Sequence, residues 1–444
     1  MGFVQATRLT IMLLALLTLL LQGCATSAQK SASMRQFLEQ GHPELALIEV
    51  EKNGDDDYVM FNMNLGILRR LNGDYAGSNE AFERAKKRIE ELYTTSLTQA
   101  AGTVIINDET MDFDGDSHEQ IMIHLYKASN YLDMGMPDSA RVEMLQSHVK
   151  MNEWNEPKDE APFLRYVSGI IFEILGEQDG ALVSYRQAVD AYKVTRSKHG
   201  LNVPRQLKND LLRLLSSARL WNEFKQYQRE FSMPNWSAPD SRGKGELIVI
   251  MHNGLVPQRT QQVIHTWSNQ LSLSVRIALP AYTQPPRYLN QVRLTVAGQR
   301  SMLETVSNID GMARAALLED MPAITARALA RAVVKKRSEK EVGEHGLLGQ
   351  LAMFAVNQAT EIADTRCWNT LPQAIQLARI YLPQGEHQLK LDILGPGGVL
   401  RDSYVVPVSI RAGQTKVLSR HWTAPRMTIK GEKNPKTVQN TLSH

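Results

Sequence analysis

The sequence predicts a multidomain protein. An all-α array of helical repeats, residues 36–231, is followed by an α+β domain with a mainly antiparallel sheet, residues 246–423. Two observations predict this fold. Small and large residues recur at matching offsets through the first half, as they do in stacked helical hairpins. After a polar, Pro-containing linker at 232–245, short segments alternate apolar and polar residues, which is typical of strands.

The start of the chain predicts export. One basic residue, Arg8, precedes the uncharged apolar run at 9–21. This is the pattern of a signal peptide, and the run is shorter than the roughly 20 residues that a spanning helix needs. The run ends in LQGC (21–24), which resembles the bacterial lipobox. That resemblance implies removal of residues 1–23 and acylation of Cys24. An ordinary secretory signal is the alternative.

The segment after Cys24 indicates where the anchor lies. Residues 24–35 are mostly small and polar, so we expect a tether there. Ala25 occupies the place where an aspartate would suggest retention in the inner membrane. We therefore expect a lipid-anchored protein on the periplasmic face of the outer membrane.

Composition excludes several classes. The chain has 50 basic and 47 acidic residues, so its charge does not mark it as a nucleic-acid binder. It has two cysteines. With Cys24 acylated, Cys367 has no intrachain partner, and we expect no disulfide framework. No cofactor is expected.

Three units of the first half share one register: NLGILRRLNGDYAGSNEAFERA (64–85), YKASNYLDMGMPDSARVEMLQS (126–147) and VSGIIFEILGEQDGALVSYRQA (167–188). Small residues allow two helices to cross closely, a glycine ends the first helix, and a large apolar residue fills the groove. The residues predicted to make these contacts are Gly66, Gly73, Phe82, Ala128, Gly135, Ala140, Gly169, Gly176, Ala181 and Tyr185.

This register resembles the tetratricopeptide repeat, and a generic helical bundle is the alternative. A partial copy at the front keeps Gly41, Ala46 and Val50 at the same spacing. A degenerate final helical pair is expected at 209–231. Such arrays usually hold a peptide or a partner protein on their concave face.

An insert at roughly 93–119 separates the first full unit from the second. In and just after it lie residues that invite a metal-site interpretation: Asp112, Asp114, Asp116, His118, Glu119 and His124. The glycine and the twelfth position do not fit an EF-hand, and the histidine spacing does not fit a zinc protease. We expect an acidic solvated loop and no metal.

The second half alternates strands and helices. Strands are expected at 246–254, 272–280, 290–298, 373–383, 387–396, 402–410 and 415–422. Between them, 310–341 is expected as two helices or one kinked helix, because Pro322 lies near its middle. A further helix is expected at 345–363. The order strands, helices, strands favours an α+β domain. The polar tail at 424–444 is predicted to be disordered.

One predicted helix carries regularly spaced basic residues. Arg327, Arg331 and Lys335 fall four apart. They would form either a basic stripe for anionic lipid or polymer, or a solvated helix face, and the pattern favours the solvated face.

The stretch ADTRCWN (363–369) contains Cys367. No histidine base lies close in sequence and no nucleophile elbow occurs, so a catalytic thiol is not expected. A period of two would place Asp364, Arg366 and Trp368 on one side and Cys367 on the other. We expect an ion pair between Asp364 and Arg366 beneath Trp368, and Cys367 in the core.

Four features together are similar to one family: the lipobox, the repeats, GKGELIVIMHNGL (243–255) and ADTRCWNTLPQAIQLARIYLP (363–383). They resemble proteobacterial outer-membrane lipoproteins with tetratricopeptide-like repeats. The resemblance covers nearly the whole mature chain. Genes of this family often lie beside a gene for a lipoprotein that activates penicillin-binding proteins. This neighbourhood implies a link to peptidoglycan synthesis.

The family has no established catalytic residues, and its members commonly have serine where this chain has Cys367. We therefore assign structural roles to the residues of the two motifs: His252, Asn253, Gly254, Asp364, Arg366 and Trp368.

These patterns predict a non-enzymatic periplasmic adaptor whose repeat array binds a protein partner. The resemblance places that partner in the cell-wall synthesis machinery. The alternative is a hydrolase or transferase that acts on envelope glycan or lipid through the second domain, with His252, Asn253, Gly254 and Asp364 as first candidates. A structural part of a polymer-export assembly is a third possibility.

Overall fold

The computed structural model describes residues 27–54, 57–99, 112–154, 160–268, 273–284, 289–343 and 362–427. The signal peptide and Cys24 lie outside this part, as do most of the helix expected at 345–363 and residues 428–444 of the expected tail. Within the described part, none of the helices combines the length and apolar character that a membrane crossing requires.

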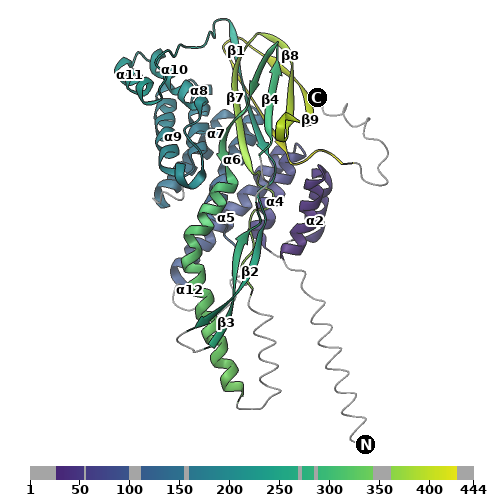
Figure 1. Ribbon diagram of the computed structural model, residues 1–444. Helices are drawn as coiled ribbons and strands as arrows, with labels where there is room; N and C mark the ends of the chain where they lie inside the picture. Colours follow the sequence, from purple (N-terminus) through teal and green to yellow (C-terminus); the bar gives the residue numbers. More distant parts are fainter. Residues whose placement is uncertain are drawn as a thin grey trace, which may run out of the picture.

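The first half is an array of antiparallel helix pairs, which confirms the predicted fold class (Figure 1). The pairs are α2 (Ser27–Glu39) with α3 (Pro43–Asn53), α4 (Tyr58–Leu71) with α5 (Tyr75–Gln99), α6 (Ser117–Asp133) with α7 (Pro137–Trp154), α8 (Pro162–Ile174) with α9 (Gln178–His199), and α10 (Arg205–Ser217) with α11 (Trp221–Glu230). Helix α2 begins inside the expected tether, so residues 27–35 are helical.

The repeat register has a direct steric cause. A Cβ on Gly66 of α4 would lie 2.4 Å from the ring of Phe82 on α5. A Cβ on Gly169 of α8 would lie 2.3 Å from the ring of Tyr185 on α9. Such distances are far below van der Waals contact, so only glycine lets each helix pair approach this closely. The two helices of the first unit and those of the third unit therefore cross at the same kind of contact, a glycine against an aromatic ring.

The turns of the three units are also alike. Gly73, Gly135 and Gly176 have φ values of +83°, +73° and +77°, just after the first helix of each pair. This left-handed conformation costs a residue with a Cβ more than it costs glycine. Sequence spacing and backbone geometry thus repeat together.

The second half contains two four-stranded sheets. One has the order β10-β1-β7-β6 and the other β5-β4-β8-β9. The first is built from β1 (Lys244–Asn253), β6 (Glu304–Asn308), β7 (Ala374–Pro383) and β10 (Thr415–Trp422). The second is built from β4 (Gln291–Val296), β5 (Gln299–Met302), β8 (Gly385–Leu394) and β9 (Leu400–Ile410). A short 3-10 helix, η3 (Pro396–Gly398), joins β8 to β9. Within these two sheets only β1 and β10 pair in parallel, so the predicted antiparallel character is confirmed.

Strand β1 separates two hydrophobic cores. Its Leu247, Val249 and Met251 pack into the core between the two sheets. Its Ile248 and Ile250 point the other way, into a core shared with the helices of the array. A strand buried on both faces reads as a continuous apolar run, which is what residues 247–251 are. The array and the sheets therefore share a core rather than meeting at a polar joint.

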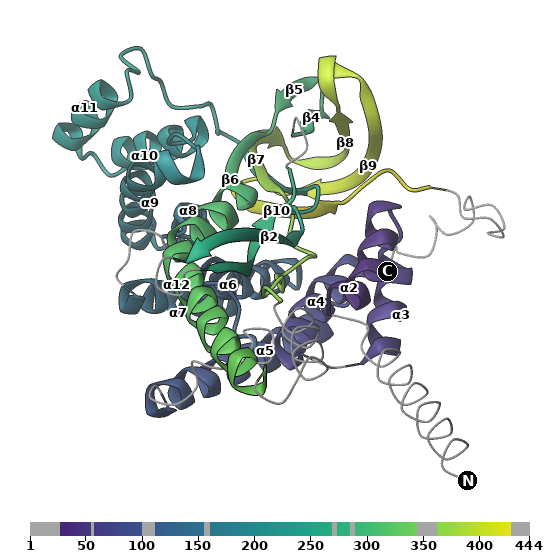
Figure 2. The same cartoon turned by 60° about the horizontal axis from the view of Figure 1, so that its bottom comes forward.

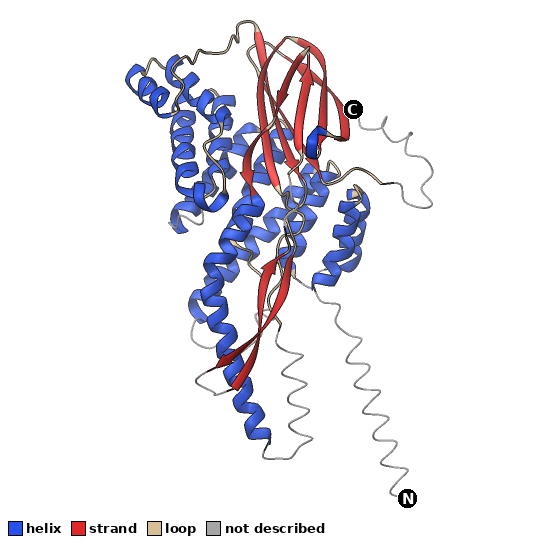
Figure 3. Ribbon diagram, viewed as in Figure 1, coloured by secondary structure: helices blue, strands red, loops and turns tan. Residues whose placement is uncertain are grey.

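A long arm extends from this body. It consists of the hairpin β2 (Arg259–Ser268) and β3 (Leu273–Tyr282) together with α12 (Ile309–Gly343) (Figure 3). Strand β3 packs its Ile277 and Leu279 against α12. Helix α12 runs through Pro322 as one element. Strand β2 was not expected from the sequence.

The start of the expected tail is ordered. The backbone N–H of Met427 donates to the carbonyl of Gln40 (2.9 Å), and Arg426 forms an ion pair with Glu44 (2.8 Å). Residues 424–427 therefore lie against the turn between α2 and α3, contrary to the prediction that disorder begins at 424.

Candidate functional site

The inner side of the array is occupied by the second half of the same chain (Figure 2). Helices of several pairs supply the contacts, and two of these contacts are on first helices. On α4, Arg70 donates to the hydroxyl of Ser419 on β10 (2.8 Å). On α8, Glu173 pairs with Arg379 on β7 (2.8 Å). The concave face that we expected to hold a partner protein is thus covered, in the part of the chain that the structure describes, by the sheet β10-β1-β7-β6.

An irregular stretch, residues 363–373, completes this cover, and we call it the inner segment. It runs between the array and the sheets. The carbonyl of its Asn369 accepts from Arg35 on α2 (3.1 Å). Its Thr370 hydroxyl donates to Asn64 on α4 (3.0 Å). The backbone N–H of Trp368 donates to Glu119 on α6 (2.6 Å). Three successive helix pairs therefore hold one extended peptide.

Trp368 anchors the inner segment. Its side chain is fully buried. The indole lies edge-on to Phe82 of α5 at 5.7 Å and to Tyr126 of α6 at 5.9 Å between ring centroids. Edge-to-face packing of this kind is favourable because the positive edge of one ring meets the negative face of another. The residue lies where two repeat units and the sheet meet.

The predicted ion pair in this segment is present, but the predicted alternation is wrong. Arg366 binds Asp364 (2.8 Å) and also Asp57 at the start of α4 (3.0 Å). Cys367 and Trp368 are both buried, although they follow one another in the chain. The segment is not a strand, and it has protein on both sides, so a period of two cannot sort its residues into inner and outer faces.

Cys367 is a core residue, as expected. It is 2% exposed, and its thiol donates to Asn369 Oδ1 (3.2 Å). Burial raises the pKa of the thiol to about 11, so the reactive thiolate is scarce at neutral pH.

We expect iodoacetamide to leave Cys367 unmodified in the native protein and to modify it after unfolding in urea. Mass spectrometry of the peptide that contains Cys367, with and without urea, measures this. Rapid labelling of the native protein would contradict the assignment and return the thiol to the list of nucleophile candidates.

His252, Asn253 and Gly254, the HNG motif at the end of β1, lie where the sheets pack against the array. The ring of His252 stacks on His421 of β10 at 4.1 Å, and both lie beside Tyr126 of α6. Asn253 donates to Gln376 Oε1 (2.9 Å) on the neighbouring strand β7. Gly254 follows with a φ of +72°, which turns the chain out of β1.

These positions do not assemble the hydrolase alternative. His252 is buried among aromatic rings, and burial lowers its pKa well below the ordinary value. Asp364 instead lines a cleft of about 470 Å³ between α12, β3 and residues 112–116, and its carboxylate binds Arg366. His252 does not line that cleft. The two first candidates for catalysis therefore belong to different places.

A group of possible metal ligands lies beside the inner segment. Asp116, His118 and Glu119 bring their ligand atoms within 4.8 Å of one another. However, Asp116 and Glu119 form the capping box of α6, Arg259 pairs with Asp116, and Glu119 also accepts from Trp368 N–H. The carboxylates already bind protein donors, and the guanidinium of Arg259 neutralises the charge of Asp116. This set fits an architectural role better than a metal site.

The three basic residues of α12 do not form a uniform face. Arg327 is exposed, but Arg331 is only 4% exposed and Lys335 is half-buried. The favoured interpretation, a solvated helix face, is therefore wrong at Arg331. A spacing of four residues alone could not reveal this, because it does not show which face of α12 packs against β3.

A second cluster of charge is buried between the array and the sheets. Arg379 of β7 binds Glu173 of α8 (2.8 Å), Asp210 of α10 (3.1 Å) and Glu246 of β1 (2.5 Å). Arg213 of α10 also binds Glu173 (2.6 Å). Burial alone would lower the pKa of Arg379, but the carboxylates outweigh it and raise that pKa well above its ordinary value. We call these five residues the charge network.

The outer side of the array carries a different feature. On α7, Val142, Leu145 and Val149 are 48%, 45% and 56% exposed. Their spacing places them on one face of the helix. The opposite face is buried in the repeat core through Ala140 and Met144. We call the three exposed residues the α7 stripe.

The α7 stripe is unusual among the repeats. In the shared register, its second and third positions correspond to Glu83 and Lys87 on α5. On α9 they correspond to Arg186 and Asp190. The neighbouring units thus have charged residues where the middle unit has Leu145 and Val149, whereas its first position, Val142, corresponds to Glu80 on α5 and to the exposed Val183 on α9. Clustered apolar side chains on a surface mark an interaction site more often than single ones do.

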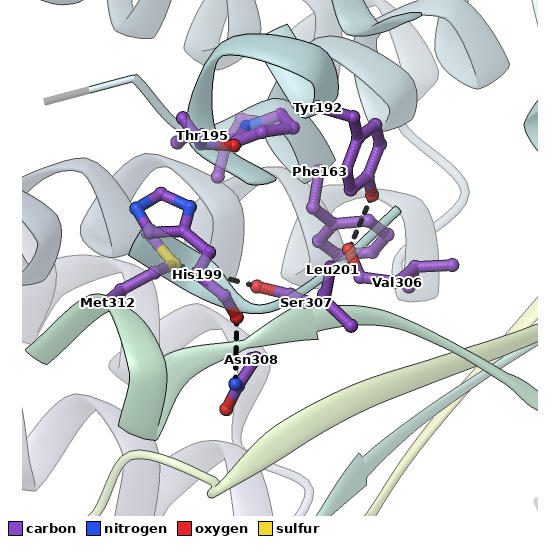
Figure 4. Close-up of a pocket in the computed structure, with 12 residues that line it drawn as sticks. Phe163, Tyr192, Thr195, His199, Leu201, Val306, Ser307, Asn308 and Met312 are labelled. Atoms are coloured by element: carbon purple, nitrogen blue, oxygen red, sulfur yellow. Dashed lines mark hydrogen bonds between the residues drawn. The ribbon is translucent and has the colours of Figure 1, made fainter. Parts of the chain in front are cut away.

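Several histidines are buried at the joint of the two halves. Figure 4 shows His199 at the end of α9, facing Ser307 and Met312, around a cavity of about 10 Å³. Asn308 Nδ2 donates to the carbonyl of His199 (2.9 Å). Burial lowers the pKa of His199 and of His118 to about 4.

We expect the free energy of unfolding to fall as the pH is lowered from about 6.5 to about 4. In the unfolded chain these histidines take up protons below about pH 6.5, but the folded protein holds them neutral, so acid favours unfolding. Glu119 acts in the opposite direction. Burial raises its pKa from 4.5 to about 8. Its contribution to the free energy of unfolding is therefore lost as the pH rises from 4.5 to 8 and regained as the pH is lowered.

Urea unfolding at pH 7, 6 and 5 measures the net effect of the histidines and the carboxyl groups on the free energy of unfolding. Burial also raises the pKa values of Asp57, Asp114 and Asp210. Carboxyl groups with lowered pKa values, such as Glu143 and Asp392, reinforce the histidines, so we expect the histidines to dominate. His199→Gln should flatten the dependence on pH. A free energy of unfolding that rises on acidification would contradict this assignment.

Comparisons with known proteins find distant likeness only. No family model matches the sequence, and no curated protein matches it. The solved structures that resemble it include "Crystal structure of MamA", with a TM-score of 0.30 and 11% identity over 48% of this chain and 99% of that one. They also include "Crystal Structure of the Apo Form of RapI", with a TM-score of 0.31 and 15% identity over 43% of this chain and 60% of that one. At these values the likeness assigns no family. The molecule is characterised by its own architecture, in which a helical-repeat array covers the sheets of the same chain.

Proposed function

We propose that this chain is a lipid-anchored adaptor of the bacterial envelope that binds a protein partner through the α7 stripe. The observation that carries the proposal is the contrast on the outer side of the array. At Leu145 and Val149 the middle unit is apolar where both neighbours are charged, and the inner side is filled by the chain itself. A partner helix with an apolar face at the same spacing fits such a stripe.

The location rests on the sequence. The apolar run that ends in LQGC supports acylation of Cys24, and Ala25 supports the periplasmic face of the outer membrane. Helix α2 begins only a few residues after Cys24, so the body would lie close to the lipid surface. A role in peptidoglycan synthesis rests on the family resemblance alone.

We expect Cys24→Ala to move the protein from the membrane fraction to the soluble fraction and to abolish incorporation of labelled palmitate. Cys367→Ala is the matched control, because it removes the other cysteine, and it should leave both properties unchanged. A Cys24→Ala protein that stays in the membrane fraction and still takes up palmitate would exclude the anchor.

The partner is tested by placing a photo-crosslinking residue at Val142, Leu145 or Val149 in living cells. We expect one protein to be crosslinked at all three positions. The triple variant V142S/L145Q/V149S should lose that partner in co-purification. The matched control V399S/L400Q changes two exposed apolar residues near the start of β9, 62% and 54% exposed, and should retain it.

The identity of the crosslinked protein decides the finer claim. A cell-wall synthesis protein supports the link to peptidoglycan. Another envelope protein keeps the adaptor and removes that link. If no protein is crosslinked at the α7 stripe, or if the triple variant keeps its partner, the stripe is not the binding surface.

A further inference from the structure

A second cleft lies at the far end of the array and is independent of the α7 stripe. It has a volume of about 520 Å³ and lies between α10, the connector 232–239 and β7. This volume is in the range of small-ligand sites. The connector that forms its wall is held in place: Trp236 Nε1 donates to Asn209 Oδ1 (3.1 Å), and its ring lies edge-on to Phe224 at 5.6 Å. We call it the connector cleft.

The floor of the connector cleft is the charge network. Asp210, Arg213 and Arg379 all line it. The Nη2 group of Arg213 donates hydrogen bonds to Glu173. The Nε–H of Arg213 is buried and has no acceptor among the described residues. A buried guanidinium N–H without an acceptor is costly, but the charge of Arg213 is neutralised by Glu173 at 2.6 Å and by Asp210 at 3.9 Å.

The rim adds a free positive charge. The side chain of Arg205, at the start of α10, is exposed and has no ion-pair partner in the described part of the chain, although its backbone N–H donates to Glu304. The acidic residue of the lining, Asp210, is already paired with Arg379. The cleft therefore offers one guanidinium that is not neutralised, that of Arg205, because Arg213 and Arg379 are paired with carboxylates of the charge network. A guanidinium recognises a carboxylate through charge-assisted hydrogen bonds.

The remaining wall is aromatic and neutral. Trp236 and Tyr381 line the cleft together with amide and hydroxyl side chains such as Asn235 and Ser237. Flat aromatic faces pack against the apolar faces of sugar rings, while amides and hydroxyls exchange hydrogen bonds with sugar hydroxyl groups. From this combination we propose that the connector cleft binds an acidic sugar, with its carboxylate at Arg205 and a ring against Trp236.

The test is calorimetric titration of the full mature chain with digalacturonic acid as the probe. We expect saturable binding that weakens with salt, because the contact is partly ionic. Arg205→Ala should weaken it about tenfold or more, since a hydrogen bond to a charged group is lost. Trp236→Phe, which keeps an aromatic ring but removes the bond to Asn209, should weaken it less than Trp236→Ala.

Arg242→Ala is the matched control. Arg242 follows the connector, its side chain is 99% exposed, and it does not line the cleft, so binding should not change. The neutral disaccharide cellobiose should bind at least tenfold more weakly. The dipeptide N-acetyl-Ala-Ala has a carboxylate but no sugar ring.

Three results would overturn the proposal. Digalacturonic acid that gives no saturable binding excludes an acidic-sugar site. Cellobiose that binds as well as the acid excludes the role of the carboxylate. Tighter binding of the dipeptide assigns the cleft to peptides instead of sugars. None of these results bears on the α7 stripe, so the two proposals fail separately.

Discussion

Replacing Arg379 with methionine is expected to lower the free energy of unfolding by about 3–5 kcal/mol, the cost of breaking a buried ion pair. The side chain is 2% exposed, and the carboxylates of Glu173, Asp210 and Glu246 converge on it. Methionine fills similar space but leaves this negative charge buried and only partly neutralised by Arg213. Urea unfolding of the wild type and the variant measures the loss.

Arg293→Met provides the control. Arg293 also binds a buried carboxylate, Asp392, at 2.8 Å, but its own side chain is 40% exposed. Lys390 and Ser403 still bind Asp392 when Arg293 is removed. We expect a loss below about 1 kcal/mol. Adding Glu246→Gln to Arg379→Met should restore part of the stability, because it removes one uncompensated charge. Equal losses in the two single variants would mean that the charge network is not what stabilises the joint.

Truncating Trp368 to alanine is expected to cost about 3–5 kcal/mol, as for other fully buried aromatic residues. The more specific expectation is that array and sheets unfold in one transition. Trp368 belongs to the hydrophobic core that contains both the helices and Ile248 of β1, so its loss weakens both halves together. Helical circular dichroism and amide exchange of β1, followed in the same urea series, measure the two halves separately.

The matched control is Trp221→Ala. Trp221 begins α11 and is 51% exposed, so we expect a change within about 0.5 kcal/mol. If the helical signal of Trp368→Ala is lost at the wild-type midpoint while the sheet unfolds earlier, the two halves are independent domains, and the shared core does not couple them.

The sequence allowed the array to be predicted because its determinants are local. Gly66 and Phe82, or Gly169 and Tyr185, lie within one helix pair, so their spacing is visible in the chain. The run 247–251 likewise identified β1. Strand β2 was missed because its apolar residues, such as Val263 and Ile264, are adjacent and lack alternation. Helix α12 continues through Pro322 as one element, which excludes the expected alternative of two separate helices.

The occupied inner side could not be predicted from the sequence. It depends on pairs such as Arg70 with Ser419 and Arg35 with Asn369, whose members are hundreds of positions apart. A single sequence carries no local signal for such pairs. For the same reason the burial of both Cys367 and Trp368 was missed: local periodicity registers one packed surface, whereas the inner segment has two.

The parallel pairing of β1 with β10 also constrains the order in which this protein matures. β10 ends at Trp422, and the inner segment precedes it by a few dozen residues. In an exported chain, both therefore leave the ribosome and cross the inner membrane after the helix pairs. Until then Phe82 and Tyr126 lack the indole that covers them, and β1 lacks both of its neighbours. Contacts of such long sequence separation form slowly. We therefore expect the newly made array to have an open inner side, prone to aggregation, until these late segments dock, and to need chaperones during that period.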